Sequence, residues 1–176
     1  KIKNMFGGDN VNTSEMRPAL HTLLRKIETP TSPSLAKKHA VCMKTLQQME
    51  SITREIYEGK RKSAFGERIT DVVSIGIGGS HLGSKLILDA LRKKTNQLNI
   101  HFLENADQNE IARVLHALEP RNTLFLIASK SFSTGETLLN AHEAKKWLSQ
   151  SHPCPEDLNK SFIGITNNSS AANAFG

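Results

Sequence analysis

The sequence predicts an α/β protein with a doubly wound parallel sheet, helices on both faces of that sheet and a helical segment in front of it. Short apolar runs alternate with longer helix-like segments from about residue 67 onward, which is the pattern of β-α-β units. The runs are apolar at nearly every position, as in strands buried on both faces. With 176 residues, of which 38% are hydrophobic, the chain is long enough for one well-buried core.

Helical spacing dominates the residues before the sheet. Asn12 precedes Glu15 by three positions, which is a capping pattern, and leucines then recur at helical spacing, so we predict a helix over residues 14–28. Two prolines interrupt the pattern, and a second apolar stripe predicts a longer helix over residues 34–57. We expect residues 1–66 to form an N-terminal helical segment that packs on the sheet domain.

The sheet domain is expected to span residues 67–176. Its predicted strands are residues 72–77, 100–103, 124–128 and 162–165. The segments between them predict crossover helices over residues 80–94, 108–118 and 134–148. Ligands bind such sheets at the carboxyl ends of the strands, so we expect a functional site in the turns that follow the strands.

The turn after the first predicted strand contains Gly76, Gly78 and Gly79, followed by Ser80. Adjacent glycines let the backbone approach a ligand without a Cβ clash, and the helix that follows directs free N–H groups toward an anion. The Ser80 hydroxyl is placed to cap that helix or to bind a ligand oxygen. A tight strand-to-helix connection with Ser80 as a plain N-cap explains the same residues. This turn alone therefore does not distinguish ligand binding from helix capping.

The turn after the third predicted strand, residues 129–134, is the stronger signal. Five hydroxyl residues lie close to Lys130 at the start of a predicted helix, namely Ser129, Ser131, Ser133, Thr134 and Thr137. Hydroxyls and backbone amides that converge at a helix start bind several phosphate oxygens together, and an ammonium adds charge. Ser133 and Glu136 also have the spacing of a capping box. Because capping needs only one hydroxyl, the turn favours phosphate binding.

A dinucleotide-binding fold is the main competing interpretation of the glycine turn. Glu104 ends the second predicted strand, where a ribose-binding acid would lie in that fold. The glycine pattern that starts at Gly76 requires Gly or Ala at position 81, where His81 stands instead. The hydroxyl-rich second turn has no use in that fold. A phosphorylated sugar is therefore the preferred ligand.

Composition argues against several other classes of protein. The net charge of +6 invites a nucleic-acid interpretation, but the basic residues fall in short, dispersed runs, and only one Trp and one Tyr are available for base stacking. No apolar stretch of about 18 residues is present, so we expect no membrane span. Cys42 and Cys154 lie in no disulfide or metal spacing, which favours a reduced, cytoplasmic setting without a bound metal.

Three strings of residues resemble the glucose-6-phosphate isomerase family and follow that family's order. They are residues 12–25, which include Asn12, Glu15, Arg17 and His21, then residues 75–83 (IGIGGSHLG) and residues 128–141 (ASKSFSTGETLLNA). The similarity runs from about Phe6 to Gly176. It implies a SIS-type (sugar isomerase) domain and an aldose–ketose isomerase of glycolysis and gluconeogenesis. Such an enzyme interconverts glucose 6-phosphate and fructose 6-phosphate without a metal, a nucleotide or another cofactor.

The resemblance also implies which residues contact the hexose 6-phosphate. The phosphate would be held by Ser129, Lys130, Ser131 and Thr134, with Lys130 acting mainly through its backbone. Gly78, Gly79 and Ser80 would border the sugar. His81 stands where the family usually has Asp, and Ser84 where it usually has Pro, so the sugar contacts of this chain are expected to differ in detail.

By the same resemblance, no catalytic residue lies in this chain. The family takes an arginine, a glutamate base, a ring-opening histidine and a lysine from later sequence, and it carries a further helical stretch before the position of Phe6. We therefore expect a fragment that binds the phosphosugar without converting it alone, and a homodimer in the full-length protein. The alternative is a non-catalytic sugar-phosphate sensor, since SIS-type domains also serve as ligand-binding modules in regulators.

Overall fold

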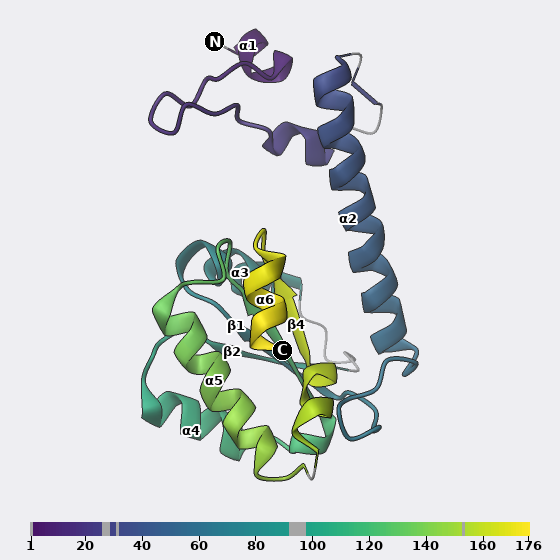
Figure 1. The fold of residues 1–176 in the computed structure, drawn as a ribbon, viewed down its shortest axis with the longest axis vertical. Helices are drawn as coiled ribbons and strands as arrows, with labels where there is room; N and C mark the ends of the chain where they lie inside the picture. The colour runs from purple at the N-terminus through teal and green to yellow at the C-terminus, as the bar shows by residue number, and fades with distance from the viewer. Residues whose placement is uncertain (1, 26–28, 31, 92–97, 153) are drawn as a thin grey trace. The chain divides into compact units, whose positions relative to one another are not determined.

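The computed structural model describes residues 2–25, 29–30, 32–91, 98–152 and 154–176 (Figure 1). The chain forms two compact units, Lys1–Arg54 and Glu55–Gly176. The first unit contains α1 (Ile2–Gly7), η1 (His21–Arg25) and most of α2 (Pro33–Tyr57). Helix α2 confirms the longer of the two helices predicted from the apolar spacing.

The helix predicted over residues 14–28 is wrong within the described residues, and its last three positions lie outside them. Asn12 pairs with Arg17 in an isolated antiparallel bridge, and only the short 3-10 helix η1 follows. The residue before a proline is driven toward extended backbone, and Pro18 follows Arg17. Oδ1 of Asn12 accepts the N–H of Glu15 at 3.3 Å, so the predicted capping contact forms but closes a turn.

The second unit contains a parallel four-stranded sheet with the strand order β2-β1-β3-β4. Its strands are β1 (Asp71–Ile75), β2 (Asn99–Leu103), β3 (Thr123–Ala128) and β4 (Phe162–Ile165). In the register of the central strands, Val73 lies beside His101 on one side and beside Phe125 on the other. All four predicted strands are confirmed, with ends that differ by at most two residues.

Helices connect the strands on both faces of the sheet. The elements between and after the strands are η2 (Gly78–Ser80), α3 (Leu82–Leu91), α4 (Gln108–His116), η3 (Pro120–Asn122), α5 (Gly135–Ser149), η4 (Pro155–Ser161) and α6 (Ser169–Phe175). Since β-α-β crossovers are right-handed, the reversal of strand order after β2 places α3 on one face and α4 with α5 on the other. Helices α4 and α5 pack against each other (Figure 1). The doubly wound fold is confirmed; positions 92–94 of the helix predicted over residues 80–94 lie outside the described residues.

The main core lies between the sheet and the face covered by α4 and α5. Phe125 in β3 is 0% exposed, stacks on Phe162 at 5.2 Å and meets the edge of Trp147 at 6.1 Å between ring centroids. Val73, Ile75, Leu103, Ile111, Leu115, Ile127, Ala141, Ala144 and Leu148 complete this cluster with other buried residues. On the opposite face α3 has no buried side chain, and four of its large apolar residues are exposed, namely Leu82, Leu86, Ile87 and Leu91.

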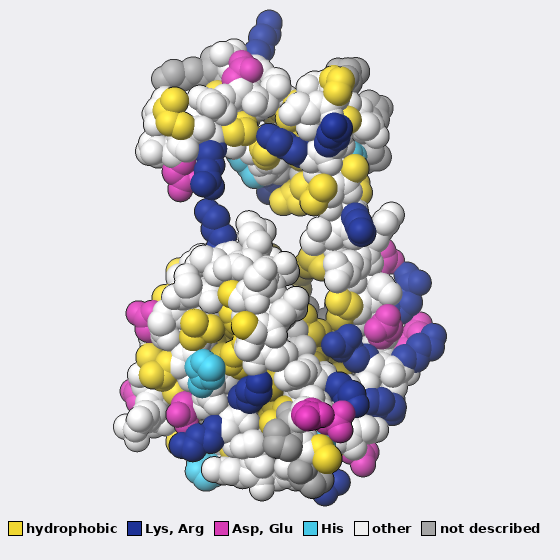
Figure 2. Space-filling view, in the orientation of Figure 1, with side chains coloured by type: hydrophobic (Ala, Val, Ile, Leu, Met, Phe, Trp, Pro, Cys, Tyr) yellow, Lys and Arg dark blue, Asp and Glu magenta, His cyan; other side chains and the backbone are white. Residues whose placement is uncertain are grey.

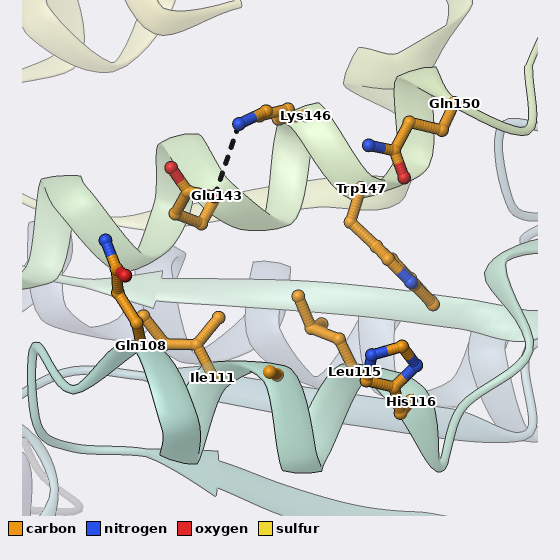
Figure 3. A pocket seen from close by; sticks show the side chains of 9 residues that line it. Gln108, Ile111, Leu115, His116, Glu143, Lys146, Trp147 and Gln150 are labelled. Atoms are coloured by element: carbon orange, nitrogen blue, oxygen red, sulfur yellow. Dashed lines mark ion pairs between the residues drawn. The ribbon is translucent and has the colours of Figure 1, made fainter.

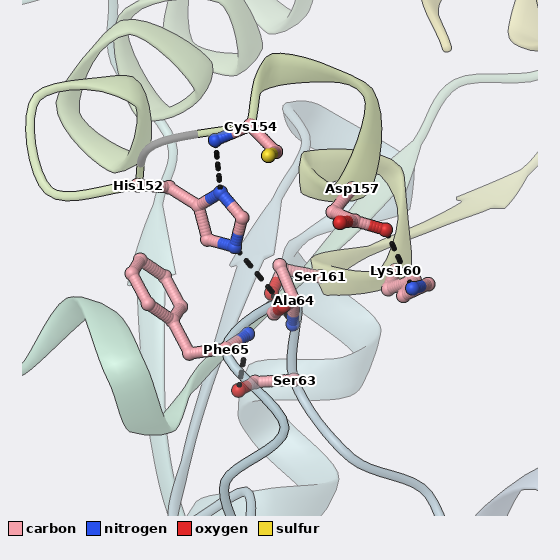
Figure 4. A network of polar contacts seen from close by, with 8 residues as sticks. All are labelled: Ser63, Ala64, Phe65, His152, Cys154, Asp157, Lys160 and Ser161. Carbon is pink, nitrogen blue, oxygen red and sulfur yellow. Dashed lines mark hydrogen bonds and ion pairs between the residues drawn. The ribbon is translucent and has the colours of Figure 1, made fainter.

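A polar network ties the segment before β1 to the end of the sheet (Figure 4). The N–H of Ala64 donates to Oγ of buried Ser161 at 2.9 Å, and the carbonyl of Ala64 accepts from Nε2 of His152 at 3.1 Å. Nδ1 of His152 accepts the N–H of Cys154 at 3.0 Å, so a neutral ring carries its proton on Nε2. The ring also lies edge-on to Phe65 at 4.5 Å.

Replacing His152 with phenylalanine is expected to lower the free energy of unfolding by about 1–2 kcal/mol. The variant keeps an aromatic ring beside Phe65 but removes two hydrogen bonds, each worth roughly 0.5–1.5 kcal/mol. Urea denaturation measures the change. His116→Phe, at an exposed position of α4, is the matched control and should stay within about 0.5 kcal/mol of the parent. Equal stability of the two variants would contradict the role of the network.

Charged side chains are dispersed over the surface. In the lower part of the view in Figure 2, Asp and Glu side chains lie among the described Lys and Arg side chains. Nζ of Lys160 donates a hydrogen bond to Oδ1 of Asp157 at 2.6 Å (Figure 4). This hydrogen bond, together with the positive charge of Lys160, lowers the pKa of Asp157 below its ordinary value of 3.8.

Candidate functional site

The sheet topology brings the two predicted turns together. Strands β1 and β3 are parallel neighbours, and the chain leaves their carboxyl ends in opposite directions across the sheet, which makes this edge a topological switch point. A Cβ added to Gly76 would lie 3.1 Å from the carbonyl oxygen of Ala128 and 3.2 Å from Cβ of Ser80. A side chain at position 76 would thus press on the second turn, and the close approach of the two turns favours glycine there.

The first turn presents an exposed backbone. Gly78 has a φ of +52°, a conformation that L side chains rarely adopt, and Gly78, Gly79 and Ser80 are all exposed. The N–H of Ser80 donates to the carbonyl of Ile77 at 3.0 Å, and the N–H of His81 donates to the carbonyl of Gly78 at 3.0 Å. The Ser80 hydroxyl forms no hydrogen bond with any described residue, so the structure gives it no capping role.

The hydroxyls of the second turn face one another in pairs. Oγ of Ser129 lies 3.1 Å from Oγ1 of Thr134, and Oγ of Ser131 lies 2.6 Å from Oγ of Ser133. Thr134 is the N-cap of α5 through its backbone, and its side chain makes no capping hydrogen bond. The capping box that Ser133 would form at the N-cap is therefore absent from this described segment. The hydroxyls contact one another instead of capping the helix; Ser129 is buried, and Ser131 and Ser133 are exposed.

Backbone N–H groups add to these hydroxyls. The N–H groups of Lys130, Ser131, Ser133 and Thr134 donate no hydrogen bond within the described residues. Buried Phe132, with a positive φ of 51°, reverses the backbone between them. The turn leads into the N-terminus of α5, a helix of 15 residues whose dipole favours a negative charge there. Free N–H groups, hydroxyls and a helix N-terminus together make a site suited to an anion with several oxygens.

Residues after β4, which the sequence analysis did not identify, brace this turn. Oγ1 of Thr166 and the N–H of Asn167 both donate to the carbonyl of Lys130, at 3.1 Å and 3.0 Å. Nδ2 of Asn168 donates to the carbonyl of Ser131 at 3.1 Å. Because a trans peptide unit is planar, holding the Lys130 carbonyl also directs the N–H of Ser131. The polar run that follows β4, beside the carboxyl end of β3, was the signal available in the sequence.

Two hollows in the surface lie away from these turns. One of about 370 Å³ lies between α4 and α5, where Trp147 and Leu115 face each other below the Glu143–Lys146 pair (Figure 3). The other, of about 570 Å³, lies in the unit Lys1–Arg54 and includes His21. Neither hollow includes a residue of the two turns. Gly78, Gly79 and Ser80 in the first turn and Lys130, Ser131 and Ser133 in the second are exposed, whereas Ser129 is buried.

The fold and the two turns place the chain among doubly wound α/β proteins whose candidate ligand site lies at the topological switch point. The family model of phosphoglucose isomerase matches residues 1–176, and the chain therefore belongs to the phosphoglucose isomerase family. This result confirms the family resemblance of the three sequence strings.

Solved structures agree with this fold. The chain is similar to a glucose-6-phosphate isomerase from Chlamydia trachomatis, with a TM-score of 0.74 and 24% identity over 94% of this chain and 31% of that one. It is also similar to the hypothetical protein TT0462 from Thermus thermophilus, with a TM-score of 0.59 and 30% identity over 74% of this chain and 30% of that one. The chain thus spans less than a third of the length of either protein. Among the described helices, none has both the length and the apolar character needed to cross a membrane.

Proposed function

We propose that the two turns bind a hexose 6-phosphate at the topological switch point. The proposed phosphate ligands are Ser129, Lys130, Ser131 and Thr134, and the residues proposed to border the sugar are Gly78, Gly79 and Ser80. The observation that carries this proposal is the set of N–H groups and hydroxyls at the start of α5 that lack capping roles within the described residues. The exposed glycine turn beside it leaves room for the rest of the ligand.

We further infer that the chain contributes this site to a glucose-6-phosphate isomerase. The family match over residues 1–176 supports an isomerase in preference to a sensor. Aldose–ketose conversion needs a base that moves a proton between C1 and C2 of the sugar, and it must reach that carbon-bound proton. We assign no such base in the two turns. We propose that the catalytic residues come from outside these 176 residues, since the Chlamydia isomerase is much longer than this chain.

Assembly and location are part of the same proposal. The four exposed apolar residues of α3 support burial of that face by further chain or by a second subunit, in keeping with a homodimer of the full-length protein. We propose the cytoplasm as its location, as expected for a SIS-type enzyme that acts on sugar phosphates without a cofactor. The division into an N-terminal segment of residues 1–66 and a sheet domain of residues 67–176 stays a prediction.

Calorimetric titration with fructose 6-phosphate tests the proposed binding site. We expect saturable binding that fructose, which lacks the phosphate, does not reproduce. The double variant Ser131→Ala/Thr134→Ala should weaken binding by at least about tenfold, because hydrogen bonds to a charged group contribute roughly 1.5–3 kcal/mol each.

Ser149→Ala is the matched control for this titration. It removes an exposed hydroxyl at the other end of α5, where Oγ of Ser149 donates to the carbonyl of Lys146, and it should bind like the parent. Equal binding by the double variant and the control would show that the second turn is not the phosphate site. If the folded parent chain binds no fructose 6-phosphate, the proposed function of these turns is wrong.

A further inference from the structure

A buried histidine follows the glycine turn directly. His81 is 1% exposed, and it lies between η2 and α3, next to Ser80. Its Nε2 lies 2.6 Å from Oε2 of Glu104, although the N–H is not aligned on that oxygen as in a hydrogen bond. Its Nδ1 is buried and has no hydrogen-bond partner among the described residues. Within that part of the chain, Glu104 is the only side chain at ion-pair distance from the imidazole.

The segment that carries Glu104 is itself anchored to α5, the helix that follows residues 129–134, the turn proposed to bind the phosphate and called the phosphate turn below. The carbonyl of Asn105 accepts from Nδ2 of Asn140 at 3.1 Å. Asn140 lies in α5 and is 0% exposed, so this contact is shielded from water. Nζ of Lys85 lies 3.6 Å from Oε1 of Glu104, which adds a contact from α3. The residues after β2 therefore contact α5 on one side and the start of α3 on the other.

We propose that Glu104 is a positioning residue for the sugar side of the site and acts through His81. This inference rests on the proposed hexose-phosphate site and adds a residue to it. A buried imidazole without a polar neighbour is unfavourable, so the negative charge of Glu104, 2.6 Å from Nε2, stabilises the ring in its place. The backbone N–H of His81 in turn donates to the carbonyl of Gly78 at 3.0 Å, and Gly79 and Ser80 lie between these two residues in the sequence. Glu104 thereby sets where Gly79 and Ser80 meet the sugar.

The phosphate turn does not depend on this contact. Its carbonyls are held by Thr166, Asn167 and Asn168, which follow a different strand. The pairing with His81 also gives a role to Glu104, the acid that a dinucleotide-binding fold would have used for a ribose. The sugar side and the phosphate side of the site can thus be perturbed separately.

Glu104→Gln in the whole chain separates the two sides. Glu104 is chosen over fully buried His81 because its side chain is 34% exposed, and glutamine has the same shape. By calorimetry we expect fructose 6-phosphate to bind about tenfold more weakly, because glutamine removes the charge beside His81, and inorganic phosphate to bind within about twofold of the parent. Glu110→Gln is the matched control. It makes the same chemical change beside Asn105, whose Nδ2 donates to Glu110 at 3.0 Å, and both ligands should bind it like the parent.

Each result of this experiment decides the proposal. An unchanged affinity for fructose 6-phosphate in Glu104→Gln, or an equal loss for both ligands, overturns it. If the parent chain binds no fructose 6-phosphate, the proposed function fails instead, and amide hydrogen exchange of the ligand-free protein decides the role of Glu104. Faster exchange of the Ser80 and His81 amides in Glu104→Gln than in Glu110→Gln supports the positioning role. Equal exchange in the two variants overturns it.

Discussion

Replacing Phe125 with alanine is expected to lower the free energy of unfolding by about 3–5 kcal/mol, the largest stability effect that we predict for this chain. The ring is 0% exposed at the centre of β3 and contacts the rings of Phe162 and Trp147. Truncation removes buried apolar surface and leaves a cavity that the close-packed sheet cannot fill. Against a typical total stability of about 5–15 kcal/mol, such a loss is large.

Chemical denaturation followed by circular dichroism measures this loss. Leu139→Ala is the matched control, because Leu139 lies on α5 and its side chain is 46% exposed. It should cost less than about 1 kcal/mol, since little apolar area leaves the protein interior. A loss below about 1.5 kcal/mol for Phe125→Ala would mean that the main core does not lie between the sheet and the pair α4 and α5.

Replacing Gly76 with valine is expected both to destabilise the chain, by about 1–3 kcal/mol, and to abolish binding of fructose 6-phosphate. A Cβ at this position would lie 3.1 Å from the backbone oxygen of Ala128, which follows the last β1–β3 pair, Ile75 with Ile127, and itself pairs with Ile165 of β4. Making room for a larger side chain therefore shifts backbone at the end of the sheet. The variant therefore separates the two turns at the switch point. Denaturation measures the first effect, and calorimetric titration with fructose 6-phosphate measures the second.

Gly83→Ala is the control for this variant. Position 83 lies in α3 with nothing within 4 Å of an added Cβ, and alanine is a better helix former than glycine by roughly 0.8–1.0 kcal/mol. We expect this control to be at least as stable as the parent and to bind equally well. If Gly76→Val binds fructose 6-phosphate like Gly83→Ala, the close contact of the two turns is not needed for the site.

The sequence by itself was sufficient to predict the class of fold and to single out the two turns. Apolar strands are visible as short runs, and the run at residues 162–165 coincides with β4. Burial on both faces, which such runs lead one to expect, is wrong for β4, because Gly164 and Ile165 are exposed in this structure. The turn of residues 129–134 stood out because its hydroxyls outnumber what a helix cap requires, and its binding of phosphate stays a proposal. The three strings of residues also indicated the family that the comparison over residues 1–176 confirmed.

Local patterns failed where a distant or competing contact decided the structure. The spacing of residues 14–28 is helical, yet Pro18 and the bridge between Asn12 and Arg17 impose a turn. The N-cap explanation of Ser80 also rested on local spacing, and the structure gives its hydroxyl no hydrogen bond to a described residue. Backbone restrictions and hydrogen-bond partners thus overrode propensity in both places.

Only the tertiary structure decided how the site is assembled. The strand order β2-β1-β3-β4 places Gly76 against Ala128, the contact that joins the two turns, and no local pattern encodes the order of strands in a sheet. The same order brings Glu104 to His81, across the carboxyl ends of β2 and β1. The physical reason is that apolar runs and helical spacing are patterns of residues that neighbour one another in the chain. The partners of a hydrogen bond or an ion pair are set by which strands lie side by side once the core has formed.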